Sequence, residues 1–212
     1  MTSDAGELAG ALALARLGDE AGFLRLWRAL QPRLLRYLLV LGCADADDIA
    51  SETWLQVVRD LPGFIGGEPE FRGWLFTIGR HRAIDAARAR ARRPASPMDP
   101  TDPAVEATLA DDQQVEQQVI DGMSTAAAVR LLSRLSPDQA EAVALRVLAG
   151  LETSDAARIL GKSAGSVRVA LHRGLKALAA DPAIRAMAAT GVRAAAGAVT
   201  DPNRAVLGEV DW

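Results

Sequence analysis

Residues 151–178, LETSDAARILGKSAGSVRVALHRGLKAL, contain the spacing that decides the fold. A short helix is expected to end at Gly161, and after a tight GKSAG turn a second, basic helix follows that Ser163 can cap. Helix-turn-helix units have this spacing, and they lay the second helix in the major groove of B-DNA, which admits one α-helix. The stretch therefore predicts a helical domain that reads duplex DNA. The alternative is an ordinary three-helix packing motif with a solvated basic face.

Four side chains of the second helix share the face opposite to its apolar positions: Arg168, Val169, His172 and Arg173. Arginines there can bind phosphate or donate two hydrogen bonds to guanine, and the valine can contact a thymine methyl group. The apolar positions that we expect to hold the helices together are Ala156, Ile159, Leu160, Val167, Leu171 and Leu175.

The composition of the 212-residue chain fits an all-α protein of two small domains. Leucine and alanine dominate the apolar half and β-branched residues are sparse, which argues against an all-β or parallel-sheet fold. Cys43 is the single cysteine, so an internal disulfide and most cysteine-based metal sites are excluded. No apolar stretch reaches the ~18 residues of a membrane span, and acids stand where a signal peptide would carry bases. We therefore expect a cytoplasmic protein without a cofactor or membrane insertion of its own.

Helical periodicity divides the chain into two domains. Three helices are expected over residues 20–41, from Asp45–Asp47 to the stop at Pro62-Gly63, and over 71–93, with Pro32 breaking or kinking the first. They form one domain, residues 1–94. A second domain, residues 126–181, begins with a helix that Ser136 caps, with Pro137 first in the helix and Gln139 completing a capping box. Residues 95–125 read as a linker, and residues 182–212 form a tail of unknown role.

Charge is segregated along the chain although the net charge is only −3. Residues 71–93 hold seven arginines against Asp85, a balance of +6, and residues 158–176 hold five bases and no acid, a balance of +5. Between them, residues 96–125 carry seven acids and no base, or −7. Two basic modules joined by an acidic linker suggest two contacts with a polyanion. Because a net-acidic chain binds nucleic acid poorly by charge alone, another component is expected to deliver it to DNA.

Two further features have competing interpretations. Phe64, on a Gly- and Pro-rich loop, is a candidate to stack an unpaired base, whereas Trp74 and Phe76 fit the domain core at least as well. Asp48 and Glu52 share one helix face near Leu55, which favours a protein-binding face over a plain solvated face or a catalytic pair. His81 and His172 lie among bases and fit contact with nucleic acid or solvent better than metal binding.

Three stretches together resemble the extracytoplasmic-function class of bacterial RNA polymerase sigma factors, in the sigma-70 family. They are DADDIASETWLQVVRDLPGF, FRGWLFTIGRHRAIDAARARARRP and LSPDQAEAVALRVLAGLETSDAARILGKSAGSVRVALHRGLKAL, and they occur in the order and spacing of that family. The resemblance covers about residues 20–94 and 126–180. It implies two helical domains, sigma region 2 and sigma region 4, joined by the acidic linker.

The resemblance also implies roles for particular positions. Residues of the acidic helix match the face that docks on the clamp helices of the polymerase largest subunit: Asp48, Ile49, Glu52 and Leu55. The loop Phe64–Glu70 matches the element that captures a flipped base of the −10 promoter element, and Arg80, His81 and Asp85 lie near that strand. The recognition-helix positions that face the −35 element are Arg168, Val169, His172 and Arg173.

The resemblance implies a non-enzymatic initiation factor whose partners are core RNA polymerase, promoter DNA and an anti-sigma protein. The sequence of the chain indicates no catalytic residue, metal site or cofactor. Two other interpretations stay open at this point: a helix-turn-helix regulator that binds duplex DNA alone, and a nucleic-acid-processing hydrolase.

Overall fold

The computed structural model describes residues 2–92, 125–182 and 184–185, and these are helical with no strand, which confirms the all-α class. The acidic linker expected over 95–125 and most of the tail expected over 182–212 lie outside the described residues. By its internal contacts the chain divides after Gly174 into two compact units. No described helix combines the length and the apolar run that a membrane crossing needs.

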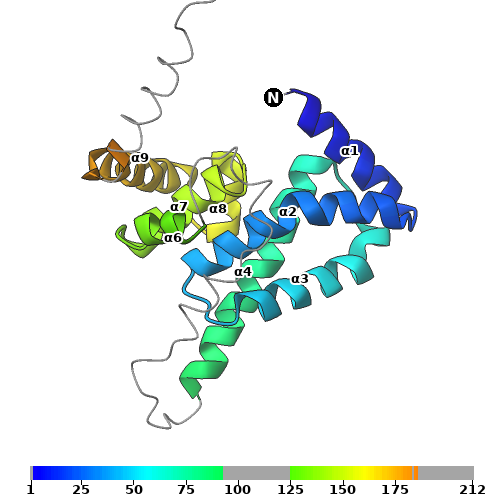
Figure 1. Ribbon diagram of the computed structural model, residues 1–212, viewed down its shortest axis with the longest axis horizontal. Coiled ribbons are helices and arrows are strands. Elements are labelled where there is room, and N and C mark those ends of the chain that lie inside the picture. The colour runs from blue at the N-terminus through cyan, green and yellow to red at the C-terminus, as the bar shows by residue number, and fades with distance from the viewer. Residues whose placement is uncertain (1, 93–124, 183, 186–212) are drawn as a thin grey trace, which may run out of the picture. The chain divides into compact units, whose positions relative to one another are not determined.

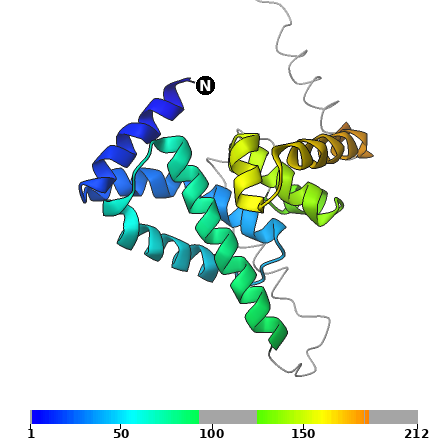
Figure 2. The ribbon, with the colours of Figure 1, turned by 180° about the vertical axis from the view of Figure 1, so that it is seen from behind.

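Four α-helices form the N-terminal part of the chain. They are α1 (Thr2–Arg16), α2 (Glu20–Val40), α3 (Ala46–Asp60) and α4 (Glu68–Arg92), with a 3-10 turn η1 (Leu61–Gly63) after α3. Figure 1 shows α1 folded back along α2, and Figure 2 shows α4 as one long helix that crosses α2 and α3. The sequence analysis did not predict α1. Its signal is the helical spacing of four residues that are buried against the bundle: Leu8, Ala11, Leu12 and Ala15.

Helix α2 runs through Pro32 without a break, so of the two predicted effects of this proline, a break or a kink, the break is wrong. A proline inside a helix removes one backbone hydrogen bond and costs about 3 kcal/mol. Here the apolar stripe on both sides of the proline is fully buried, at Leu26, Leu30, Leu34 and Leu38, each at most 1 % exposed. At about 1.5–3 kcal/mol for each buried leucine, tertiary packing outweighs the local preference of the proline.

Aromatic side chains close the core of this part. Tyr37 of α2 meets Phe76 of α4 edge to face, with ring centroids 5.3 Å apart. Trp54 of α3 packs edge to face on Phe23, and its Nε1 donates a 2.7 Å hydrogen bond to Gln31. Phe76 is fully buried, as the core interpretation of that residue predicted.

Four further helices follow the linker: α6 (Thr125–Leu132), α7 (Pro137–Val147), α8 (Thr153–Leu160) and α9 (Ala164–Ala180). The predicted turn between α8 and α9 is confirmed. Gly161 ends α8 in the left-handed region at φ 63°, and the Ser163 hydroxyl accepts from the Ser166 amide at 3.1 Å. Ser136 is the N-cap of α7 as predicted, but its side chain makes no capping hydrogen bond, so the predicted capping box is not formed.

Helix α9 lies close to α7 because Gly174 has no side chain. A Cβ atom at this position would stand 2.8 Å from Cγ2 of Val143, closer than real contacts allow. Val167 and Ala156 are buried as predicted, whereas Leu175 is 44 % exposed and does not belong to the core. The buried position in this turn of α9 is the glycine beside it, which a search for apolar spacing overlooks.

The close contact of α1 with α2 makes a testable prediction. A Cβ atom at Gly22 would stand 2.7 Å from Cβ of Leu14 and 2.8 Å from the Ala11 carbonyl oxygen. Gly22→Ala should therefore lower the free energy of unfolding by about 1–3 kcal/mol through overpacking. The matched control is Gly10→Ala in α1, where nothing lies within 4 Å, and it should stabilise the chain by about 0.5–1 kcal/mol. Urea unfolding measures both, and equal effects of the two substitutions would contradict the packing argument.

Candidate nucleic-acid interface

The predicted reading face of α9 is open to solvent. Arg168, Val169, His172 and Arg173 are all exposed, and Val169 has 49 % of its surface accessible. Within the described parts of the chain, neither Arg168 nor Arg173 forms an ion pair with an acid. Two cations without an acidic partner among the described residues, beside an exposed apolar side chain, suit a surface that meets phosphates and base edges.

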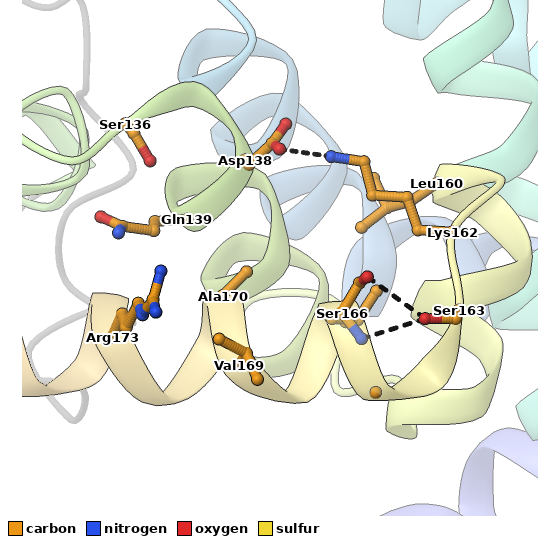
Figure 3. A pocket seen from close by; sticks show the side chains of 12 residues that line it. Ser136, Asp138, Gln139, Leu160, Lys162, Ser163, Ser166, Val169, Ala170 and Arg173 are labelled. Carbon is orange, nitrogen blue, oxygen red and sulfur yellow. Dashed lines mark hydrogen bonds and ion pairs between the residues drawn. The ribbon is translucent and has the colours of Figure 1, made fainter.

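A groove of about 690 Å³ runs between this face and the start of α7. Figure 3 shows Arg173 rising from α9 into the same space that Ser136 and Gln139 line from α7. At the other end, Lys162 Nζ lies 2.5 Å from Asp138 Oδ2 and ties the α8–α9 turn to α7. The first turns of α7 and α9 both border the groove, so backbone N–H groups add to its positive character. A groove with basic and hydroxyl side chains in its lining can accept a phosphate backbone beside the reading helix.

The three residues of the basic helix α4 that are predicted to bind the −10 strand differ in exposure. His81 and Asp85 are exposed, and Asp85 lies 3.5 Å from Arg88, one turn further along the helix. Arg80 is different, because its Nε donates a 2.7 Å hydrogen bond to Oε1 of Glu141 in α7. The side chain of Arg80 is only 22 % exposed. Of these three residues, Arg80 is thus paired with a carboxylate, Glu141, from the other predicted domain.

The loop before α4 presents a different apolar side chain from the one predicted. Phe64 is half-buried and stacks on Trp74, with ring centroids 5.0 Å apart, and meets Phe71 edge to face. Ile65, the next residue, is 90 % exposed. Gly66 follows with φ 145°, a conformation that suits glycine. Sequence reasoning passed over Ile65 because it searched this loop for aromatic residues, although a lone isoleucine before two glycines was visible.

The predicted docking face of α3 is partly exposed. Asp48, Glu52 and Leu55 face solvent, with Leu55 71 % exposed, whereas Ile49 is only 5 % exposed and belongs to the core. Glu52 is held by Arg82 of α4 at 2.7 Å. Val58, one turn after Leu55 and 52 % exposed, extends the apolar strip and was not predicted. Acids flanking an exposed apolar strip suit a protein partner better than a solvated face.

The described residues contain no group of three or more His, Cys, Asp or Glu that could hold a metal ion. Cys43 is a free and buried cysteine, and burial raises the pKa of its thiol. Such a thiol behaves as a small apolar group.

Comparison with known proteins follows the same division of the chain. The family described as Sigma-70 region 2 matches residues 26–93, and the family described as Sigma-70, region 4 matches residues 125–178. The ECF RNA polymerase sigma factor SigD of Mycobacterium tuberculosis is 31% identical over 184 residues, which cover 84% of this chain and 85% of SigD. This chain belongs to the extracytoplasmic-function family of RNA polymerase sigma factors.

Other relatives agree with this assignment. The ECF RNA polymerase sigma factor BldN of Streptomyces coelicolor is 30% identical over 179 residues, 84% of this sigma factor and 66% of the length of BldN. The structure of CnrH in complex with the cytosolic domain of CnrY matches at a TM-score of 0.52 and 22% identity, over 82% of this chain and 96% of the other. The sigma factor RpoE of Bartonella quintana, in complex with the anti-sigma factor NepR, matches at a TM-score of 0.51 and 22% identity. The match covers 74% of this chain and 93% of the other. These solved structures share the fold.

Family membership decides between the interpretations that the sequence left open. As a sigma factor, the chain is a transcription initiation factor that associates with RNA polymerase and binds promoter DNA. A regulator that binds DNA alone and a nucleic-acid-processing hydrolase are other classes of protein.

Absorbance of the Tyr37 phenol can report on its contact with Glu141. Tyr37 is the single tyrosine of the chain, and its hydroxyl donates a 3.0 Å hydrogen bond to Glu141 Oε1. Burial, and then the charge of Glu141, raise the pKa of Tyr37 well above its ordinary value. The phenol should therefore ionise only above pH ~10, as absorbance at high pH would show. Glu141→Gln should lower this pKa only in part, because burial remains; an unchanged titration would contradict the contact.

The same shift has a consequence for stability. A proton that the folded state binds more tightly than the unfolded state stabilises the fold fully at pH values below the unfolded pKa of ~10. This contribution should be lost as the pH rises from there through the folded pKa of Tyr37. Urea unfolding on either side of pH ~10 checks the sign, and Tyr37→Phe should remove this part of the pH dependence.

Proposed function

We propose that this sigma factor is a promoter-specificity subunit that divides its work among three surfaces. The exposed strip of α3 docks on the clamp helices of the polymerase largest subunit. The loop Phe64–Glu70 and the face of α4 at Arg80, His81 and Asp85 hold the −10 strand. The face of α9 reads the −35 duplex. The observation that carries this proposal is the exposed basic face of α9 on a helix-turn-helix unit, where Arg168 and Arg173 have no acidic partner among the residues that the structure describes.

This division of labour needs no enzymatic site. Melting of the −10 element follows if unpaired bases are held more tightly than paired ones, and the exposed Ile65 beside the half-buried Phe64 and Trp74 supports such binding at the loop. Action at promoters implies a cytoplasmic location. We retain the boundaries 1–94, 95–125, 126–181 and 182–212 for region 2, linker, region 4 and tail.

Control by an anti-sigma protein is part of the proposal. RpoE of Bartonella quintana shares the fold and is seen with the anti-sigma factor NepR. The apolar strip of Leu55 and Val58 offers a surface that an inhibitor could cover in place of polymerase.

Replacement of Arg173 tests the reading face. Arg173→Ala should weaken binding of the reconstituted polymerase to −35-containing promoter DNA by about 1–3 kcal/mol, because a cation at the groove is lost. Arg130→Ala, at an exposed arginine of α6 outside the groove, is the matched control and should change binding little. A titration by fluorescence anisotropy measures both. Equal effects of the two substitutions would remove Arg173 from the reading face.

A second pair of variants tests docking on polymerase. Leu55→Asp places a charge in the apolar strip of α3 and should weaken binding to core polymerase by about 1–2 kcal/mol, roughly tenfold. Leu17→Asp, at a leucine that is 87 % exposed beyond the end of α1, is the control and should leave affinity unchanged. If both variants bind core polymerase like the unmodified chain, the docking face lies elsewhere.

A further inference from the structure

One carboxylate joins α7 to two helices of the N-terminal part. Oε1 of Glu141 accepts hydrogen bonds from the Tyr37 hydroxyl of α2 at 3.0 Å and from Arg80 Nε of α4 at 2.7 Å. All three residues lie in the first compact unit of the chain, in which α2 also contacts α6 and α7, and α4 contacts α8. The group is shielded from water, since Tyr37 is fully buried and the Glu141 side chain is 15 % exposed.

A second polar contact lies near the N-terminal end of α4. Arg72 forms an ion pair with Glu68 of its own helix, and its Nη1 donates a 3.3 Å hydrogen bond to the carbonyl oxygen of Ala149, just after α7. Gly150, at φ 66°, makes room there for the guanidinium group. This contact ends on a neutral backbone oxygen, so the charge of Arg72 is balanced within α4. Glu141 is therefore the group from region 4 that neutralises a cation of α4 within the described residues.

The cation that Glu141 neutralises is one that the proposed function assigns to promoter DNA. Arg80 is expected near the −10 strand, whereas His81 and Asp85 on the same helix are exposed. A carboxylate and a phosphate both accept charge-assisted hydrogen bonds from a guanidinium group. Because Nε of Arg80 already donates to Glu141, a phosphate can take this donor only after the carboxylate leaves.

We propose that Glu141 is an intramolecular competitor of the −10 strand, which keeps Arg80 occupied in a closed state of the free chain. This inference rests on the proposed role of Arg80 at the −10 element. In the closed state region 4 lies against α2 and α4; in the open state Arg80 is available to DNA. Glu141 thereby limits DNA binding until region 4 moves away, as binding at separate −10 and −35 elements would require.

The energetics suit a switch. Opening exchanges the hydrogen bonds that Glu141 accepts from Tyr37 and Arg80 for hydrogen bonds to water, so these contacts favour the closed state by a modest net free energy. The polar contacts described here end on one carboxylate and one backbone carbonyl, and a polymerase interface of ordinary size can outweigh them. The apparent affinity of the free chain for single-stranded DNA is then reduced in proportion to the fraction that is open.

Binding of a single-stranded DNA probe by the full chain without polymerase tests the inference. The probe is fluorescein-labelled oligothymidylate of about 12 nucleotides, which reports phosphate and stacking contacts regardless of promoter sequence. Glu141→Gln removes the charge and keeps the shape of the side chain. It should increase the affinity for the probe at least about fivefold, since the open fraction rises.

Glu152→Gln is the matched control. It makes the same change in net charge in region 4, but Glu152 is 73 % exposed and lies 3.7 Å from Arg146 of α7. General electrostatic attraction to the probe therefore changes equally in the two variants, and only release of Arg80 separates them. Equal affinities of Glu141→Gln and Glu152→Gln would overturn the proposal.

Two more variants test whether the gain in affinity depends on Arg80 and whether it occurs in a folded chain. Adding Arg80→Ala to Glu141→Gln should abolish the gain, and a gain that persists would overturn the role of Arg80. Tyr37→Phe removes a single hydroxyl from the contact, preserves its volume, and should increase affinity in the same direction by a smaller factor. Because this substitution is mild, it provides the test if Glu141→Gln fails to fold, and an unchanged affinity of a folded Tyr37→Phe chain would then count against the proposal.

The failure of this inference can be told apart from failure of the proposed function. If the chain supports initiation by core polymerase but Glu141→Gln and Glu152→Gln bind the probe equally, the competitor role alone is wrong. If Glu141→Gln gains affinity through Arg80 but the chain does not support initiation, the closed state stands and the promoter role is wrong.

Discussion

Burial of the apolar stripe of α2 is the constraint on which the described structure depends. Leu26, Leu30, Leu34 and Leu38 lie on one side of this helix and are almost fully withdrawn from water. Helix α2 contacts α1, α3 and α4, and also α6 and α7 beyond the linker. The stripe explains why a helix continues through Pro32, and it fixes α3 and α4 so that their outer faces carry the functional side chains.

Function in this sigma factor depends on which charges the fold leaves unpaired. The arginines of α9 have no acidic partner among the described residues. In α4, by contrast, ion pairs join Arg82 to Glu52, Arg90 to Asp45 and Arg80 to Glu141. The basic helix α4 therefore offers much less free positive charge than its composition suggests. An acidic chain with a few uncompensated cations binds DNA weakly by itself, which agrees with delivery by polymerase.

The sequence predicted the elements whose signals are local. The start of α9, the end of α8 at Gly161, the Ser163 cap and the exposed face at Arg168 and Arg173 all follow from spacing and turn chemistry within about 20 residues. The family assignment from three stretches was likewise confirmed. These features need no knowledge of distant neighbours.

Features that depend on distant contacts were missed or predicted wrongly. Continuation of α2 through Pro32 follows from packing of its leucine stripe against other helices. The burial of Gly174 follows from the approach of α7, and the withdrawal of Phe64 follows from stacking on Trp74. The pairing of Arg80 with Glu141 joins residues 61 positions apart, so composition alone made Arg80 look free. The roles of the individual site residues remain predictions.

The most direct test of the central claim is run-off transcription with purified core polymerase on genomic fragments. Addition of the chain should produce transcripts from a defined subset of fragments that core polymerase alone does not transcribe, and the chain should co-purify with the enzyme. If the pattern of transcripts is unchanged on every template and no association is found, the account of this chain as a promoter-specificity subunit is contradicted.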